Sequence, residues 1–226
     1  MTGRGPLVVK LGGAAVAGVG EACALAAGRP LLVVHGGGAQ ISELMRRRDI
    51  EPRFVGGRRV TDLPTLACAR HALARVSDEL VAALHTARVE AVPLRNGEVL
   101  LAERIAELGL VGRIVEVDRD PLDAAFAAGR VPLLAPLARD SSGRFLNVNA
   151  DDVAAAVAAA VGADELVFLS DVPGVLDADG VVIATIRAAD PPAVSGGMVP
   201  KLAACAEALR GGVARVRIGA GTVVTP

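Results

Sequence analysis

The chain has 226 residues, 52% of them hydrophobic, and its 24 basic side chains nearly balance 25 acidic ones. A net charge of -1 gives no electrostatic attraction to nucleic acid or to an anionic membrane. The longest uncharged apolar stretch, residues 153–163, is too short to span a bilayer, and residues 1–6 lack the apolar core of a signal peptide. Three widely spaced cysteines in alanine-rich helical patterns indicate buried thiols, so we expect a cytoplasmic globular protein without disulfides.

Strand-like apolar segments alternate with helical segments along the chain. In chain order the patterns predict a strand over residues 6–11, a helix over 14–27, a strand over 30–34, a helix over 39–48, one or two helices over 63–87, a strand over 89–94, hairpins within 96–117, a helix over 121–128, a strand over 131–135, a helix over 150–161, a strand over 166–169, a helix over 198–210, a strand over 213–218 and a short terminal strand. Turns are expected at residues 140–143 and 177–180, and Asp62 is a candidate N-cap. Repeated strand–helix–strand units with buried strands predict a mainly parallel sheet flanked by helices.

The basic residues are divided unevenly between arginine and lysine. Twenty-two are arginine, and Lys10 and Lys201 are the only lysines. A composition so rich in Ala, Gly, Val and Arg indicates a coding bias that replaces ordinary surface lysine by arginine. A lysine that persists under such a bias suggests a need for a compact ammonium group, which a planar guanidinium cannot replace. Chance survival of two lysines is the alternative.

Glycines follow two of the predicted strands directly. Gly12 and Gly13 follow the first strand, and the run Gly36–Gly38 follows His35 at the end of the second. Ligands of open α/β sheets bind beyond the carboxyl ends of the strands, where glycine lets backbone N–H groups approach an anion. The two loops could form one phosphate site or be tight turns, and neither matches a P-loop or the G-x-G-x-x-G pattern. His35, a lone histidine at a strand end, is interpreted as structural.

Four further polar segments lie at the end of a strand or at the start of a helix. Residues 56–62 are expected to form a loop carrying Arg58 and Arg59, which could bind a carboxylate or be a solvated pair. Residues 147–152 bring two asparagines and two aspartates to an apolar helix, more polar groups than capping requires. Residues 171–176 place a carboxylate and a glycine at another strand end, and residues 195–201 open a helix with Lys201 in its first turn.

Taken in order, these segments resemble the amino acid kinase family. The matching segments are Val-Val-Lys-Leu-Gly-Gly, Val-His-Gly-Gly-Gly, Phe-Val-Gly-Gly-Arg-Arg-Val-Thr-Asp, Phe-Leu-Asn-Val-Asn-Ala-Asp, Leu-Ser-Asp-Val-Pro-Gly-Val-Leu, Gly-Gly-Met-Val-Pro-Lys and Gly-Thr-Val-Val. The resemblance covers essentially the whole chain and is greatest to the members that phosphorylate N-acetyl-L-glutamate in arginine biosynthesis. It implies an open three-layer αβα sandwich with a mainly parallel sheet. It also implies a single domain over residues 1–226, with an amino-acid-binding lobe over 1–148 and an ATP-binding lobe over 149–226.

The resemblance implies a role for each matching residue. The enzyme would use ATP and Mg²⁺, with Lys10 and Lys201 stabilising the transferring phosphoryl group and Asp151 orienting both lysines. The implied substrate contacts are Gly36, Gly37, Gly38, Arg59 and Asn147, with Arg59 holding the α-carboxylate. The implied nucleotide contacts are Gly12, Gly13, Asp171, Val172, Pro173, Gly174, Val175, Leu176 and Ser195. No protein residue is implied as a metal ligand.

The chain departs from the family pattern in two places. Residues 93–98 lack the serine and aspartate of a Gly-x-Ser-Gly-x-Asp-Gly segment. The segment between about residues 178 and 196 is shorter than is usual in the family, which reduces the implied adenosine pocket. In this family an extra N-terminal helix accompanies hexamers inhibited by arginine, and its absence before the first strand leads us to expect a homodimer without that regulation.

Two alternatives to this function remain open at the level of the sequence. One is the sister kinase of lysine biosynthesis, which acts on aminoadipate or glutamate attached to a carrier protein and would present a basic surface, for which residues 46–53 are a candidate. The other is a non-catalytic amino-acid-binding regulator on the same fold. Lys10, Asp151 and Lys201 together argue against the regulator, because a binding module needs no phosphoryl clamp. The expected partner is a small-molecule amino acid, not nucleic acid or a membrane.

Overall fold

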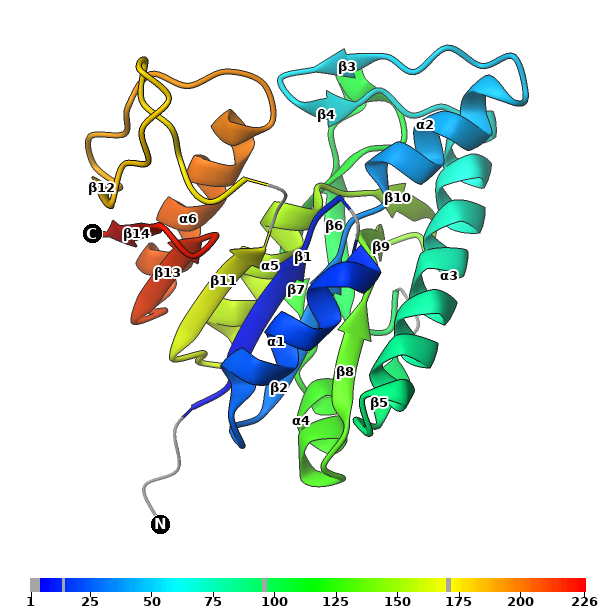
Figure 1. Cartoon of the computed structure of the whole chain (residues 1–226). Coiled ribbons are helices and arrows are strands. Elements are labelled where there is room, and N and C mark those ends of the chain that lie inside the picture. The colour runs from blue at the N-terminus through cyan, green and yellow to red at the C-terminus, as the bar shows by residue number, and fades with distance from the viewer. Residues whose placement is uncertain (1–4, 14, 95–96, 170–171) are drawn as a thin grey trace.

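An eight-stranded sheet runs through the centre of the protein (Figure 1). The computed structural model describes residues 5–13, 15–94, 97–169 and 172–226. The sheet has the order β12-β14-β13-β11-β1-β2-β8-β5. Its strands are β1 (Leu7–Leu11), β2 (Leu31–His35), β5 (Ala91–Pro93), β8 (Val131–Leu134), β11 (Glu165–Leu169), β12 (Thr185–Arg187), β13 (Arg215–Ile218) and β14 (Thr222–Thr225). All neighbouring pairs are parallel except β13 and β14, which confirms the prediction of a mainly parallel sheet.

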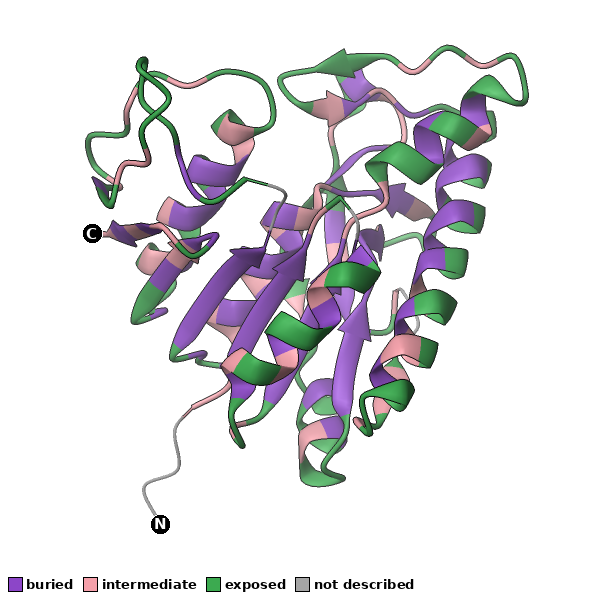
Figure 2. Cartoon of the chain, viewed as in Figure 1, coloured by how far each residue is buried: buried purple, intermediate pink, exposed green. Residues whose placement is uncertain are grey.

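Helices cover both faces of this sheet and complete three layers. One face packs against the 3₁₀ turn Ala15–Gly18, α1 (Val19–Ala26) and α3 (Leu63–Thr86), and the other against α4 (Asp120–Ala127), α5 (Ala150–Ala160) and α6 (Met198–Arg210). The central strands are buried throughout, whereas each helix exposes its outer side (Figure 2). The three-layer αβα arrangement expected from the sequence is therefore confirmed.

The alternation of side chains along β1 decides where its polar residue goes. Leu7, Val9 and Leu11 pack with α1 and α3, whereas Val8 packs with α5 and α6. Because successive side chains of a strand point to opposite faces, Lys10 shares the face of Val8. The strand pattern thus directs the Lys10 side chain toward the N-terminal ends of α5 and α6.

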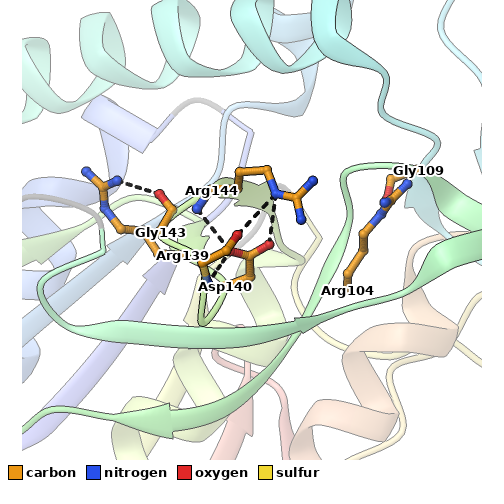
Figure 3. A network of polar contacts seen from close by, with 7 residues as sticks. Arg104, Gly109, Arg139, Asp140, Gly143 and Arg144 are labelled. Atoms are coloured by element: carbon orange, nitrogen blue, oxygen red, sulfur yellow. Dashed lines mark hydrogen bonds and ion pairs between the residues drawn. The ribbon is translucent and has the colours of Figure 1, made fainter.

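A second, smaller sheet lies beside the large sheet. The smaller sheet has the order β10-β9-β6-β7, formed by β6 (Leu100–Arg104), β7 (Gly112–Val117), β9 (Leu137–Arg139) and β10 (Phe145–Asn147), with a 3₁₀ turn at Ala106–Leu108. Asp140 holds the predicted turn between β9 and β10, where its carboxylate accepts hydrogen bonds from the backbone N–H groups of Ser142 and Arg144 (Figure 3). This turn brings Asn147 back toward the carboxyl edge of the large sheet.

Two expectations about local structure are corrected. Residues 56–62 are not only a loop, because β3 (Phe54–Val55) and β4 (Arg58–Arg59) form a hairpin around Gly56 and Gly57. Strands of two residues are too short to show a period in the sequence. The helix expected over residues 14–27 is also shorter, since the described part begins as a 3₁₀ turn and becomes α-helical only after Gly18.

The N-terminus of α3 gives a prediction about stability. Asp62 caps this helix by accepting a hydrogen bond of 2.8 Å from the Thr65 N–H, as the sequence predicts. Replacing Asp62 with alanine should lower the free energy of unfolding by about 1 kcal/mol at pH 7. The hydrogen bonds from Thr65 lower the pKa of Asp62. The stabilisation should therefore be complete above the pKa of the unfolded chain and disappear as the pH falls through the lower pKa of the folded state.

Urea unfolding of the Asp62→Ala variant at pH 7 and at pH 3 measures this effect. The control is Asp78→Ala, which removes an exposed carboxylate from the interior of the same helix. A loss of the same size in both variants, or a loss for Asp62→Ala that is no smaller at pH 3 than at pH 7, would show that the cap contributes nothing specific.

Candidate active site

Two lysines meet on one carboxylate beyond the carboxyl ends of the central strands. Lys10 Nζ lies 2.9 Å from Asp151 Oδ1, and Lys201 Nζ lies 3.1 Å from Asp151 Oδ2. All three side chains are buried. The structure therefore brings together the three residues that the sequence singled out for phosphoryl transfer.

Helix starts position both Asp151 and Lys201. Asn149 caps α5 by accepting hydrogen bonds from the N–H groups of Asp151 and Asp152, which fixes Asp151 in the first turn. Lys201 lies in the first turn of α6, and its ammonium group is 4.8 Å from the centre of the Phe168 ring. That ring and the carboxylate together hold the Lys201 ammonium group in place.

The ion pairs determine the charge state of this cluster. Burial by itself would raise the pKa of Asp151, but the charges and hydrogen bonds of Lys10 and Lys201 outweigh it and hold the pKa below its usual value. Burial lowers the pKa of Lys201, with a further lowering from the charge of Lys10, while Asp151 opposes both. Two ammonium groups share a single carboxylate, so the cluster keeps an excess positive charge that suits an anionic ligand.

A cavity of about 180 Å³ opens beside this cluster. It is lined by Lys10, Gly36, Gly37, Gly38, Ile41, Phe54, Gly57, Arg58, Arg59, Val111, Pro136, Asn147, Val148, Asn149, Ala150 and Asp151. The substrate residues predicted from the sequence all lie in this lining. Residues far apart in the chain thus share one cavity, because β1 and β2 end, and α5 begins, at the same edge of the sheet.

Arg59 is a buried cation within this lining and retains only 6% of its exposed surface. Its guanidinium donates to Gly38 O and Ser42 Oγ, both at 2.9 Å, and lies 4.6 Å from the centre of the Phe54 ring. Among the described residues no carboxylate lies within ion-pair distance of Arg59. Burial lowers the pKa of Arg59, yet guanidinium remains charged at neutral pH. A buried arginine with only neutral partners is suited to a carboxylate from a ligand.

Asn147 is fixed beside Arg59 by a chain of hydrogen bonds. Its Nδ2 donates to Thr61 Oγ1 at 3.1 Å, and Thr61 Oγ1 donates to Arg59 O at 2.8 Å. The Asn147 N–H donates to Leu110 O. Asn147 and Arg59 therefore keep a fixed relative position, as two residues that bind one small molecule require.

The glycine loops contribute differently from one another. The Gly36 N–H already donates to Leu11 O, and the Gly12 N–H to Leu169 O. Gly38 starts α2 (Gly38–Arg46), whose first N–H groups have no partners within the helix. The loops after β1 and β2 are adjacent, because these strands pair from Leu7 with Leu31 to Leu11 with His35. The N–H groups of Gly36 and Gly12 are thus already bonded within the sheet, whereas those at the start of α2 have no acceptor within their own helix.

Apart from Asp171, which lies outside the described residues, the predicted nucleotide residues do not line this cavity. Gly12 and Gly13 follow β1, and β1 pairs with β11, so the segment after β11 lies beside them. Within that segment the Val175 N–H donates to Thr222 Oγ1 at 2.9 Å. Ser195 is exposed shortly before α6. Gly12 and residues 172–176 thus follow two neighbouring parallel strands, β1 and β11, at the carboxyl edge of the sheet.

Some supporting residues were not found from the sequence. Ser42 and Met45 were not predicted, and together with the predicted Gly38 they hold the Arg59 guanidinium from one side of α2. Their spacing places them on one helix face, which is a usable sequence signal. His35, interpreted as structural, is buried on the other face of the sheet, where its Nε2 is 2.8 Å from Ser77 Oγ on α3.

The described residues form neither a membrane-spanning helix nor a cluster of metal-ligating side chains. Within the described ranges, no helix has both the length and the apolar character needed to cross a bilayer. In the same ranges, no three His, Cys, Asp or Glu side chains are grouped so that they could hold a metal ion.

Comparison with known proteins finds similarity over nearly the whole chain. The model of the amino acid kinase family matches residues 5–220. The chain is 42% identical to the acetylglutamate kinase of Acidobacterium capsulatum, over 93% of this chain and 89% of that protein. The solved structure of smu.665 from Streptococcus mutans UA159 has a TM-score of 0.90 at 30% identity, over 97% of this chain and 98% of that one. N-acetylglutamate synthase from Neisseria gonorrhoeae, at 24% identity and a TM-score of 0.86 over 99% of this chain and 60% of that one, has a similar fold.

Proposed function

Because the chain belongs to the amino acid kinase family, we propose that it uses ATP to phosphorylate the side-chain carboxylate of N-acetyl-L-glutamate. The product is N-acetyl-L-glutamyl 5-phosphate, an intermediate of arginine biosynthesis. Relatives named acetylglutamate kinase, at 36% to 42% identity, support this substrate. The observation that carries the proposal is the meeting of Lys10 and Lys201 on Asp151, beside a cavity with a buried arginine that has only neutral partners.

The reaction needs charge and position more than it needs a base. The substrate carboxylate is already ionised at neutral pH, so no side chain has to remove a proton. Its oxygen bonds to the γ-phosphorus of ATP, while the bond from that phosphorus to the bridging oxygen breaks and ADP leaves with the electron pair. Lys10 and Lys201 face the transferring group with compact cations, and Asp151 keeps them apart and oriented.

Mg²⁺ fits this scheme as part of the nucleotide substrate. Mg²⁺ usually keeps several waters and binds one or two carboxylates together with phosphates. Asp151 is the only carboxylate in the cavity lining among the described residues, and both of its oxygens face ammonium groups. We therefore propose that Mg²⁺ arrives bound to the ATP phosphates, where it neutralises part of their charge.

The remaining assignments follow from this scheme as proposals. The ATP phosphates would lie near Gly12 and Gly13, and the nucleoside near residues 171–176 and Ser195. The boundary between an amino-acid-binding lobe and an ATP-binding lobe would fall at residues 148–149, between β10 and α5. We also propose a homodimer in the cytoplasm. The balanced charge and the free cysteines support the compartment, and the family resemblance supports the dimer.

A substrate panel tests the proposed function. The purified protein should consume ATP with N-acetyl-L-glutamate, and hydroxylamine should trap the acyl phosphate as a hydroxamate. Activity only on aminoadipate or glutamate bound to a carrier protein would instead assign the sister kinase of lysine biosynthesis. Amino-acid binding without ATP consumption would assign a regulator. The curated relatives favour neither alternative.

Arg59→Ala should separate binding of the amino acid from binding of ATP. Loss of a charged hydrogen-bonding partner typically costs about 1.5 to 3 kcal/mol, which corresponds to a rise of about tenfold to a hundredfold in KM for N-acetylglutamate. The KM for ATP should change by less than about twofold, since Arg59 lies in the cavity and away from the nucleotide segments.

Steady-state kinetics with each substrate varied in turn measures this difference. Arg53→Ala is the matched control, because Arg53 is exposed just before the same hairpin. Equal rises in both KM values would remove Arg59 from the proposed role.

A further inference from the structure

Neighbouring arginines hold the β3–β4 hairpin from two sides. Arg58 and Arg59 are consecutive in β4, so their side chains point to opposite faces. Arg59 points to α2, where it contacts Gly38 and Ser42. Arg58 points to α5, where its Nη2 lies 2.7 Å from Asp152 Oδ2. The hairpin is thus attached to both sides of the cavity.

The turn of the hairpin makes a second contact beside the lysine cluster. Gly57 has a positive φ of 76°, and a Cβ at this position would lie 3.0 Å from Pro200 Cγ. Pro200 directly precedes Lys201, just as Asp152 directly follows Asp151. Figure 1 shows the hairpin on the side of the sheet to which the arrow of β8 points. The contacts of Arg58 and Gly57 therefore each fall on a residue next to a member of the lysine cluster.

The hairpin has little packing of its own to fix its position. Phe54 is 55% exposed and Val55 is 56% exposed, and each of the two strands has only two residues. Isolated two-stranded hairpins are at best marginally stable in water. The position of Arg59 over the cavity therefore depends on contacts such as the one between Arg58 and Asp152.

The surroundings of Asp152 explain why it needs Arg58. Burial raises the pKa of Asp152, the nearby charges of Asp151 and Glu207 raise it further, and the charge and hydrogen bond of Arg58 oppose them. Arg58 Nη1 is buried and has no hydrogen-bond partner among the described residues. The pair is partly exposed, and such pairs stabilise a fold only weakly. Its consequence should therefore be seen in substrate binding more than in folding.

We propose that the Arg58–Asp152 ion pair is a positioning contact, which holds residues 54–59 against α5 and so keeps Arg59 in register with Lys10, Asp151 and Lys201. Arg58 acts through Arg59 and the hairpin, and transfers no group itself. Loss of the ion pair should weaken binding of the amino acid and not of ATP, because the hairpin lines the amino-acid cavity. This inference rests on the proposed function for its kinetic part and on the hairpin geometry alone for its structural part.

A double-mutant cycle tests the kinetic part. Arg58→Met and Asp152→Asn should each raise KM for N-acetylglutamate about tenfold, with KM for ATP changed less than about twofold. The double variant should be no worse than the more impaired single variant, because both substitutions remove the same contact. The control is Arg113→Met, which removes an exposed ion pair with Glu103 on the smaller sheet and should leave both KM values unchanged. Multiplicative effects of the two substitutions, or equal effects on both KM values, would overturn the proposal.

Hydrogen–deuterium exchange tests the structural part without any substrate. In Asp152→Asn, amides of residues 54–59 should exchange faster than in the original protein, while amides in the middle of α3 stay unchanged. Unchanged exchange in the hairpin would overturn the positioning role. If the original protein fails to phosphorylate N-acetylglutamate, the proposed function fails, and the exchange result still decides whether the ion pair holds the hairpin.

Discussion

Replacing Lys201 with arginine is expected to lower kcat by about a hundredfold or more while the protein stays folded. Removal of one preorganised group that stabilises transition-state charge typically has an effect of this size. Arginine keeps the positive charge, but its planar fork is bulkier than an ammonium group. Lys201 is 7% exposed and lies between Asp151 and the Phe168 ring, so the larger group cannot take the same position.

The hydroxamate assay at saturating substrates measures this loss. Arg210→Lys is a suitable control, since Arg210 lies in the last turn of the same helix and forms an exposed pair with Glu207. Thermal unfolding of both variants separates lost chemistry from lost folding. Near-normal kcat in a folded Lys201→Arg protein would remove Lys201 from the reaction.

Asp151→Asn is expected to impair both catalysis and stability. The substitution leaves the Lys10 and Lys201 ammonium groups, now about 3 Å from a neutral amide, without the charge that separates them. Loss of one partner from a buried ion pair commonly costs about 3 to 5 kcal/mol of stability. Asp151 also raises the pKa of Lys201, so its removal weakens the positive charge offered to the phosphoryl group. We expect kcat to fall by about a hundredfold or more.

The pH dependence of unfolding gives this prediction a second measurement. The pKa of Asp151 is lowered in the folded protein, so its stabilisation is present above the pKa of the unfolded chain and is lost as the pH falls through the folded-state value. Urea unfolding of Asp151→Asn should therefore lack part of the acid sensitivity of the original protein. Asp123→Asn, in the first turn of α4 with an exposed partner Arg119, should retain all of it. Identical pH profiles for Asp151→Asn and the original protein would contradict the assignment.

Local pattern accounts for most of the framework around the site. The alternation in β1 predicts a buried strand, and the same alternation sends Lys10 to the face of α5 and α6. The cap of Asp62 on α3 and the turn at Asp140 depend on hydrogen bonds between residues two to four positions apart. Such features are readable from sequence because the interacting groups are neighbours along the chain.

The β3–β4 hairpin shows where local pattern stops. Its strands of two residues carry no measurable period, and residues 56–62 could equally be interpreted as a loop. From the sequence, Arg59 could be a solvated residue or a residue that binds a carboxylate. Its burial in the folded protein excludes the solvated alternative. The pairing of Arg58 with Asp152 joins residues that no local spacing relates.

The amino-acid sequence by itself determined the strand–helix alternation, the glycine-rich strand ends and the two exceptional lysines. Tertiary structure alone decided that Lys10, Asp151 and Lys201 are in contact, and that Arg58 and Arg59 face opposite sides of one cavity wall. The physical reason is the range of the interactions. Backbone dihedrals, caps and side-chain periods depend on near neighbours, whereas contacts between strand ends and helix starts depend on how whole helices pack on the faces of the sheet.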